Sequence, residues 1–194
     1  MNFRKGSDKM RTEEKIIKLK DGREAILRNP SPDEAAEMVD FLKKVSAETD
    51  FLLRGADDEF MTVDEERKFL EGKLASKTGL MICCYVKDGE VFRHAGSAGL
   101  SFYSRKKLAH RANIGISILK EFWGLGIGTA MMREIESIAK NLNILQLELE
   151  FVEGNSRARA LYEKCGFRVA GLHPDAFLMP DGSMKNEYLM IKKI

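Results

Sequence analysis

The chain places three glycines within six residues, Trp123-Gly124-Leu125-Gly126-Ile127-Gly128, between a strand-like and a helix-like segment. Residues 112–119 before them carry isoleucine at positions 114, 116 and 118, the period of two that is typical of a strand. Residues 129–141 after them, from Thr129 onward, have the apolar spacing of a helix. Glycines in such a turn let the backbone approach an anion, and the helix N-terminus adds a favourable dipole. This order of strand, glycine turn and helix therefore predicts an anion site.

Two common phosphate-binding patterns do not fit this turn. A Walker loop needs a lysine before its serine or threonine, whereas here Gly128 directly precedes Thr129. A dinucleotide fingerprint needs a small residue three positions after Gly128, where this chain has Met131. Hydrolysis of a nucleoside triphosphate and binding of a nicotinamide cofactor are therefore disfavoured. A turn that is glycine-rich only because it is tight stays open as an alternative.

The segments on either side of the turn predict a mixed sheet with flanking helices. A parallel strand pair joined by a crossover helix has to be buried on both faces, so the half that follows the turn should form the centre of the domain. The predicted strands are 15–19, 23–27, 80–86, 98–103, 112–119, 145–152 and a closing hairpin within 177–191, and the predicted helices start at Ser31, Thr62, Thr129 and Ser156. The fold class is therefore α/β in the wider α+β sense, with a mostly antiparallel central sheet.

Charge and apolar content limit the partners of such a domain. The 32 basic and 30 acidic side chains leave a formal net charge of +2, too small a field to gather nucleic acid or an anionic membrane. No window approaches the roughly 18 apolar residues of a membrane-spanning helix. Residues 1–12 include a basic run without the apolar stretch of a signal peptide, so we expect a flexible tail there and a single domain over 13–194. Neither nucleic acid nor membrane is an expected partner, and a cytoplasmic location is expected.

The cysteines and histidines form no pattern of disulfides or metal ligands. Cys83 and Cys84 are adjacent on a predicted strand, and Cys165 lies at a helix end with no histidine at helical spacing. The three histidines, at positions 94, 110 and 173, are scattered over different segments. The sequence therefore predicts no metal site and no cysteine nucleophile.

Two motifs resemble the GCN5-related N-acetyltransferase (GNAT) superfamily. The glycine turn, Trp123-x-x-Gly126-x-Gly128, is similar to the family's pyrophosphate motif Arg/Gln-x-x-Gly-x-Gly/Ala, with tryptophan at its first position. Residues 155–167 match every fixed position of the family's Asn-x-x-Ala-x-x-Leu-Tyr-x-x-x-Gly-Phe signature. The likeness in the order of elements extends over residues 15–194. The resemblance implies the acyl-CoA N-acyltransferase fold, with acetyl-CoA as co-substrate and an amine as acceptor.

The resemblance also assigns cofactor-binding residues. In this family the strand before the turn splays from its parallel neighbour, and the pantetheine arm pairs with it as an extended peptide would. The residues in that place are Ile116, Ser117 and Ile118, and the pyrophosphate would lie on the turn from Trp123 to Thr129. The Ile118 N–H would face the oxyanion of a direct transfer. Asn155 would bind the cofactor or a backbone group, and it also has the place of a helix N-cap.

The same signature names a general acid but leaves the general base open. Tyr162 matches the family's tyrosine, which the resemblance implies as the proton donor to the departing coenzyme A thiolate. Some relatives have a glutamate base where this chain has Asn113, whose amide cannot accept a proton. We therefore expect Glu150, Glu48 or a water to serve as the base. Three other acidic residues on a predicted helix are expected to be solvated: Glu65, Glu66 and Glu71.

Other functions remain compatible with these patterns. A non-catalytic acyl-CoA-binding sensor or interaction domain would keep the same fold. A phosphate- or nucleotide-binding regulatory domain would keep the glycine turn but would leave the signature of residues 155–167 unexplained. Amines of small molecules and of peptides both fit as acceptors. Specificity is expected from residues 48–61 and from the loops after Tyr103 and Gly171. A homodimer stays open.

Overall fold

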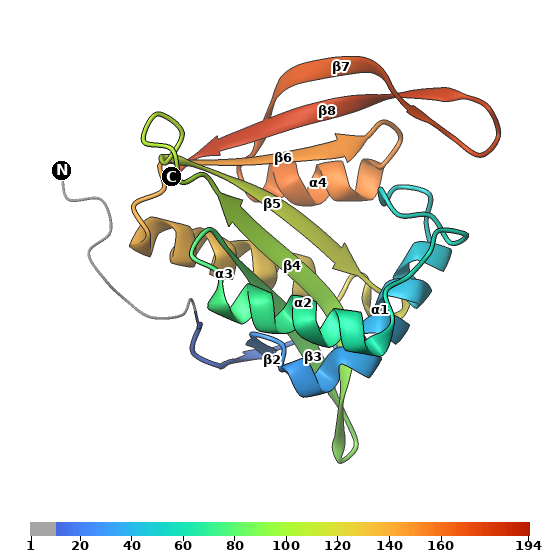
Figure 1. Cartoon of the computed structure of the whole chain (residues 1–194), viewed down its shortest axis with the longest axis vertical. Helices are drawn as coiled ribbons and strands as arrows, with labels where there is room; N and C mark the ends of the chain where they lie inside the picture. Colours follow the sequence, from blue (N-terminus) through green and yellow to red (C-terminus); the bar gives the residue numbers. More distant parts are fainter. Residues whose placement is uncertain (1–10) are drawn as a thin grey trace.

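The computed structural model describes residues 11–194, and Figure 1 shows an open eight-stranded sheet with helices on both faces. The strands are β1 Lys15–Lys18, β2 Glu24–Arg28, β3 Gly79–Asp88, β4 Val91–Phe102, β5 Arg111–Ile118, β6 Gln146–Val152, β7 Arg168–Leu178 and β8 Met184–Lys193. The helices are α1 Ala35–Ala47, α2 Val63–Ala75, α3 Ile127–Asn141 and α4 Ser156–Lys164, with short 3-10 turns η1 Pro32–Glu34 and η2 Lys120–Phe122.

The sheet has the order β1-β2-β3-β4-β5-β6-β8-β7. Its neighbouring strands run antiparallel except for β5 and β6, which are parallel. The connection between these two strands contains α3, as a parallel crossover requires. The predicted fold class, a mostly antiparallel mixed sheet with one parallel pair and flanking helices, is therefore confirmed.

Capping boxes fix where the first two helical segments begin. Ser31 accepts a hydrogen bond from the Asp33 N–H, and Glu34 accepts one from the Ser31 N–H. Thr62 and Glu65 make the same reciprocal pair at the start of α2. Each pair satisfies N–H groups that a helix leaves free at its start, and loss of such a cap costs about 1 kcal/mol.

The core lies between the sheet and two layers of helices, with α1 and α2 on one face and α3 and α4 on the other (Figure 1). Ile127, Met131 and Ile135 of α3 recur at helical spacing and are at most 1 % exposed. Phe41 of α1 and Leu70 of α2 are buried on the opposite side. Each such side chain contributes about 1.5–3 kcal/mol on burial, so the two layers hold the central strands rigidly.

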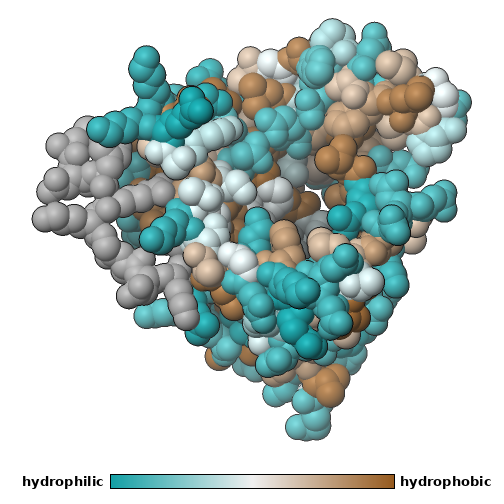
Figure 2. All heavy atoms as spheres, viewed as in Figure 1, coloured by the Kyte–Doolittle hydropathy of each residue, from teal (hydrophilic) through white to brown (hydrophobic). Residues whose placement is uncertain are grey.

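The closing hairpin begins much earlier than the sequence predicts. Strand β7 starts at Arg168, whereas the predicted hairpin lies within 177–191. No residue of β7 is buried on either face of the sheet, so this edge strand lacks the alternation of a half-buried strand. The strand is also interrupted: its register shifts between His173 and Phe177, where Pro174 and Asp175, with φ of 52°, lie. Hydrophobic side chains of this hairpin, Leu172, Leu178 and Met184 among them, gather on the surface (Figure 2).

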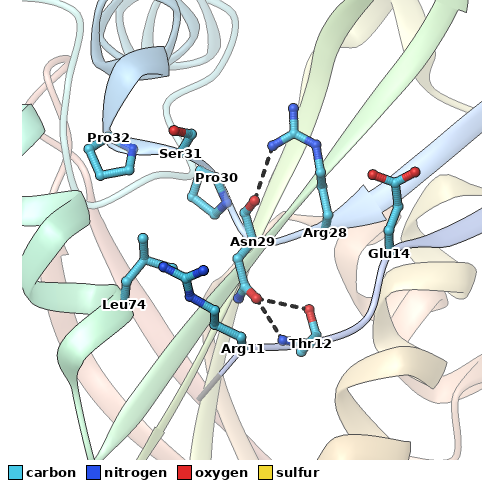
Figure 3. A pocket seen from close by; sticks show the side chains of 9 residues that line it. All are labelled: Arg11, Thr12, Glu14, Arg28, Asn29, Pro30, Ser31, Pro32 and Leu74. Atoms are coloured by element: carbon cyan, nitrogen blue, oxygen red, sulfur yellow. Dashed lines mark hydrogen bonds between the residues drawn. The ribbon is translucent and has the colours of Figure 1, made fainter. Parts of the chain in front are cut away.

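The first described residues are joined to the sheet by side-chain hydrogen bonds. Thr12 donates its N–H to Asn29 Oδ1 at 2.7 Å, and the Asn29 amide donates to the Met81 carbonyl at 2.7 Å. A hollow of about 290 Å³ lies here, lined by residues that include Arg11, Leu74 and Asn29 (Figure 3). None of the predicted site residues is among those that line it.

Residues 1–10 of the predicted N-terminal tail lie outside the described part of the chain. Across residues 11–194, no helix has both the length and the apolar character needed to cross a membrane.

The prediction that Glu66 is solvated is wrong. Glu65 and Glu71 are exposed, but Glu66 is only 1 % exposed. It precedes Leu70 by four residues on α2, so it lies on the buried face of that helix. Among the described residues neither of its carboxylate oxygens has a hydrogen-bond partner. Burial raises the pKa of the Glu66 carboxyl, and the positive charge of Arg54 offsets only part of this effect.

We expect Glu66→Gln to stabilise the protein at pH 8 by about 1–3 kcal/mol, because the amide fills the same space without the buried and unpaired negative charge. The pKa of Glu66 is higher in the folded protein than in the unfolded chain, so between these two pKa values the folded protein holds a proton that the unfolded chain has lost. The stability of the wild-type protein therefore falls as the pH rises from the unfolded-state pKa through the folded-state pKa. The gain should therefore shrink toward pH 4. Urea unfolding across this pH range measures it, with Glu71→Gln on the exposed face as the control. Equal effects of the two variants at pH 8 would contradict the assignment.

Candidate active site

Strands β5 and β6 are paired only at one end. Three residue pairs join them, Arg111↔Gln146, Ala112↔Leu147 and Asn113↔Glu148. Beyond these pairs β5 continues to Ile118 against β4 alone, and β6 continues to Val152 against β8 alone. Figure 1 shows the two strands diverging toward their carboxyl ends. The predicted residues Ile116, Ser117 and Ile118 all lie on this unpaired part of β5.

Polar side chains hold the paired end of the two strands together. Arg111 donates from Nε and Nη2 to the two carboxylate oxygens of Glu148, at 2.5 and 2.7 Å, and Glu148 is 3 % exposed. Burial alone would raise the pKa of Glu148, but the hydrogen bonds from Arg111 and Gln146 outweigh it and the pKa is lowered. This ion pair was not predicted from the sequence. An acidic residue on one parallel strand and a basic residue on the neighbouring strand indicate such an ion pair only when the register of the two strands is known.

The backbone of Ile118 is directed toward the opening between the strands. Leu119 donates its N–H to the Ala95 carbonyl on β4 at 3.0 Å. Because successive N–H groups of a strand point to opposite sides, the N–H of Ile118 points away from β4 and toward β6. The Ile118 carbonyl accepts a hydrogen bond of 2.7 Å from the Trp123 indole Nε1. The turn is thus tied to the end of β5, and the Ile118 N–H faces the opening.

The glycine turn adopts a backbone that favours glycine at two positions. Gly124 and Gly126 have φ of 78° and 96°, in the left-handed region. Gly126 is the N-cap of α3, so the helix begins at Ile127 and not at the predicted Thr129. The N–H groups of the first helical turn, from Ile127 to Thr129, have no acceptor within the helix. The predicted turn residues therefore form a helix N-terminus suited to an anion.

Gly128 brings the two sequence motifs into contact. A Cβ atom at this position would lie 2.9 Å from Leu161 Cδ2 of α4 and 3.3 Å from Ile118 Cδ1 of β5. Such distances are too short for ordinary packing, so glycine allows α4 to lie directly against the first turn of α3. The signature of residues 155–167 and the glycine turn therefore lie against each other.

Asn155 is the N-cap of α4, one of the two roles predicted for it from the sequence. Its Oδ1 accepts a hydrogen bond of 3.1 Å from the Ala158 N–H at the start of α4. This bond orients the first turn of α4 next to the glycine turn. A contact of Asn155 with a cofactor stays a prediction.

Tyr162 is buried among aromatic rings. It is 7 % exposed, and the rings of Phe151 and Phe167 lie 6.0 and 6.3 Å from its own. Burial raises the pKa of its phenol to about 12, so the hydroxyl keeps its proton at neutral pH. Its hydroxyl makes no hydrogen bond to another side chain or backbone group in residues 11–194. The tyrosine is thus a protonated side chain with an unused donor.

The two predicted base candidates occupy different places. Glu150 is exposed on β6 and accepts a hydrogen bond of 2.8 Å from the Asn113 amide on β5. Glu48 follows α1 and accepts the Lys120 N–H at 2.7 Å, just after β5.

The segment after α1 contacts both arms of the opening. Glu48 binds Lys120 beyond the end of β5. Phe51 packs against Gly154 beyond the end of β6. A Cβ atom added at Gly154 would lie 3.6 Å from the Phe51 ring. This segment therefore crosses the open end of the strand pair. The contact of Phe51 with Gly154 has no signal in the sequence, because neither residue belongs to a motif.

The cysteines do not have the surroundings of nucleophiles. Cys83 and Cys84 are fully buried, and burial raises the pKa of each thiol to about 12. Cys165 is half-buried, and burial raises its pKa as well. His94 is partly buried and stacked on Phe41, and desolvation lowers its pKa to about 4. In the described part of the chain, no three His, Cys, Asp or Glu side chains are grouped to hold a metal ion.

Comparison with known proteins shows the family of the chain. The profile of the Acetyltransferase (GNAT) family matches residues 46–167, which include the open strand pair and both motifs. An L-amino acid N-acetyltransferase, AaaT of Escherichia coli K12, is 26 % identical over 121 residues, 62 % of this chain and 72 % of that protein.

Solved structures share the fold. An acetyltransferase of the GNAT family from Streptococcus pneumoniae superposes with a TM-score of 0.77 at 30 % identity, covering 88 % of this chain and 99 % of that one. The putative acetyltransferase yncA from Salmonella typhimurium, solved with its cofactor acetyl-CoA, superposes with a TM-score of 0.70 at 13 % identity, covering 86 % and 92 %. The chain belongs to the GNAT family of acetyltransferases.

Proposed function

We propose that this protein transfers the acetyl group of acetyl-CoA directly onto a primary amine of a small molecule or peptide, with a small free amine as the preferred acceptor. The observation that carries the proposal is the strand pair β5–β6, joined over three residue pairs and open next to the glycine turn. An extended pantetheine arm can add to such an unpaired strand as a peptide would. The fold neighbour from Salmonella typhimurium was solved with acetyl-CoA, which supports the same cofactor here.

The cofactor would lie along β5 and the glycine turn. Its pyrophosphate binds the N–H groups of the turn from Trp123 to Thr129 at the positive end of α3. Its pantetheine arm pairs with the free backbone groups of Ile116 and Ile118, whereas those of Ser117 between them face β4. Asn155 orients α4 beside this path.

The reaction needs a donor for the oxyanion and one for the thiolate. The amine nitrogen attacks the thioester carbonyl, and the Ile118 N–H, which faces the opening, stabilises the oxygen as it becomes negative. The carbon–sulfur bond then breaks, and the thiolate takes the proton of the Tyr162 hydroxyl, which is later restored from water. The attacking nitrogen loses its proton to Glu150 or Glu48, directly or through water. The acetyl group passes directly from the sulfur to the amine nitrogen, without an acyl-enzyme.

Glu150 and Glu48 differ in how free their carboxylates are. Glu150 is exposed on the strand beside the opening, and one of its oxygens accepts from Asn113. Glu48 holds the backbone at Lys120, so its loss would also move the segment that crosses the opening. Glu150 is therefore the better candidate for the base, and Glu48 for positioning.

An assay of free thiol release from acetyl-CoA, run with a panel of amines, tests the proposal. The panel contains amino acids, polyamines, an aminoglycoside and short peptides, with amino acids first because the Escherichia coli relative is named an L-amino acid N-acetyltransferase. We expect release that depends on the amine. Glu150→Gln should lower turnover by about a hundredfold or more near neutral pH, and Glu48→Gln should mainly raise KM for the amine.

The main alternative is an acyl-CoA-binding sensor without activity, because a fold does not dictate chemistry. Tight binding of acetyl-CoA with no amine-dependent release across the whole panel would favour the sensor. Release that continues unchanged in Glu150→Gln would remove Glu150 as the base.

A further inference from the structure

We propose that Arg157, held over the ring of Trp123, binds a phosphate group of the coenzyme A moiety beside the glycine turn. This inference rests on the proposed function, since it names a further cofactor contact in the same site. The guanidinium carbon lies 4.4 Å from the centroid of the Trp123 ring. Trp123 is the first residue of the glycine-turn motif, so the stack places a positive charge at the turn.

The packing of α4 explains how Arg157 comes to this position. Leu161 lies against Gly128 in the first turn of α3. Arg157 precedes Leu161 by one helical turn, so both side chains lie on the same face of α4. Helical side chains also tilt toward the helix N-terminus. The guanidinium is therefore directed past the Gly128 contact and over Trp123.

Within residues 11–194, the part of the chain that the structure describes, the charge of Arg157 has no ionic or hydrogen-bonding partner. Arg159, on the same helix, donates to Glu163 at 2.8 Å. Arg157 forms no ion pair or hydrogen bond with any residue between 11 and 194. The first turn of α4 contains no acidic residue, and neither does the first turn of α3. The N-terminus of a helix is electrostatically positive, so a cation there is unfavourable unless an anion is near. Neither α3 nor α4 supplies an acidic side chain for this purpose, so a bound anion would be stabilised at both helix N-termini.

Trp123 stands where the family's motif has arginine or glutamine. The indole gives no charge to a ligand, and its N–H is already used by the Ile118 carbonyl. Stacking on the indole fixes the plane of a guanidinium while leaving its N–H edges free. Such an edge can donate two hydrogen bonds to one phosphate. The positive group that the motif lacks is thus supplied from α4.

The test compares Arg157→Gln with Arg159→Gln, which removes an equal charge two residues along the same helix. Acetyl-CoA affinity is measured by calorimetry over a series of NaCl concentrations, and unfolding curves check that both variants are folded. We expect Arg157→Gln to weaken binding by about tenfold to a hundredfold at low salt. The loss should shrink as NaCl rises, because salt screens the missing contact. Arg159→Gln should change the affinity less than twofold.

A second ligand, 3′-dephospho-acetyl-CoA, distinguishes the phosphates. If the loss persists with this ligand, the contact is to the pyrophosphate, and if it disappears, the contact is to the 3′-phosphate; either result supports the inference. Equal affinities of the two variants, or a loss that does not change with salt, would overturn it. Wild-type protein that fails to bind acetyl-CoA would overturn the proposed function itself, whereas normal wild-type binding with an unaffected Arg157→Gln would overturn only the role of Arg157.

Discussion

Gly126→Glu is expected to weaken acetyl-CoA binding at least a hundredfold, to below the limit of calorimetry, while the protein stays folded. The new carboxylate would stand at the N-cap of α3, where the pyrophosphate is proposed to bind. Two like charges about 4 Å apart repel by roughly 4 kcal/mol near a protein surface. The side chain would also occupy the space that lets the anion approach the backbone.

The control for this variant is Gly182→Glu in the β7–β8 turn. Gly126 has φ of 96°, so any side chain there adds strain of about 1–2 kcal/mol. Gly182 has φ of 81° and open space around it, so glutamate there introduces a similar backbone strain. Gly182 is far from the predicted site residues in the sequence. A folded Gly126→Glu protein with wild-type affinity would refute the turn as the pyrophosphate site. An equal loss in Gly182→Glu would show that strain alone is responsible.

Tyr162→Phe is expected to lower turnover by at least about tenfold and at most about ten-thousandfold, with acetyl-CoA affinity nearly unchanged. The variant keeps the ring packed between Phe151 and Phe167 and removes only the hydroxyl. Burial raises the pKa of the Tyr162 phenol to about 12. The hydroxyl therefore stays protonated below that pH, but it is also a weaker acid than an exposed tyrosine. The wild-type rate should therefore show no fall due to tyrosine ionisation between pH 7 and 10.

Tyr188→Phe is the matched control for the general acid. The ring of Tyr188 stacks on the Phe151 ring at 5.3 Å, and Tyr188→Phe removes a hydroxyl from the same aromatic cluster. Steady-state kinetics with saturating acetyl-CoA and amine, together with calorimetry of cofactor binding, separate turnover from affinity. Full turnover in Tyr162→Phe would remove the assignment, and so would an equal loss in both variants.

The parts of the fold that were predictable are those whose pattern is local. Period-two isoleucines in β5, capping boxes at Ser31 and Thr62 and the glycines before α3 each depend on neighbours in sequence, and the structure has all of them. The edge strand β7 was predicted only in part, because a strand buried on neither face has no alternation to detect. The burial of Glu66 was not predicted, because it depends on how α2 packs against the rest of the protein. The many charged residues of α2 are typical of a helix on the surface.

The candidate site divides in the same way. The glycine turn and the signature of residues 155–167 could be found in the sequence, but their contact at Gly128 could not, since it depends on the approach of α4 to α3. The stack of Arg157 on Trp123 and the ion pair of Arg111 with Glu148 join segments far apart in the chain. Such pairs follow from register and helix packing, which one sequence does not display.

Strand β7 leaves one edge of the sheet open, and its irregular middle bears on how the protein behaves at high concentration. An unpaired edge is a template for strands of other molecules and hence for aggregation. Pro174 has no N–H to donate, and the left-handed Asp175 bends the strand where its register shifts. An incoming strand could pair with Arg168–His173 but could not continue the ladder past Pro174. The interruption therefore protects a hairpin that exposes Leu172 and Leu178 from growing into a shared sheet.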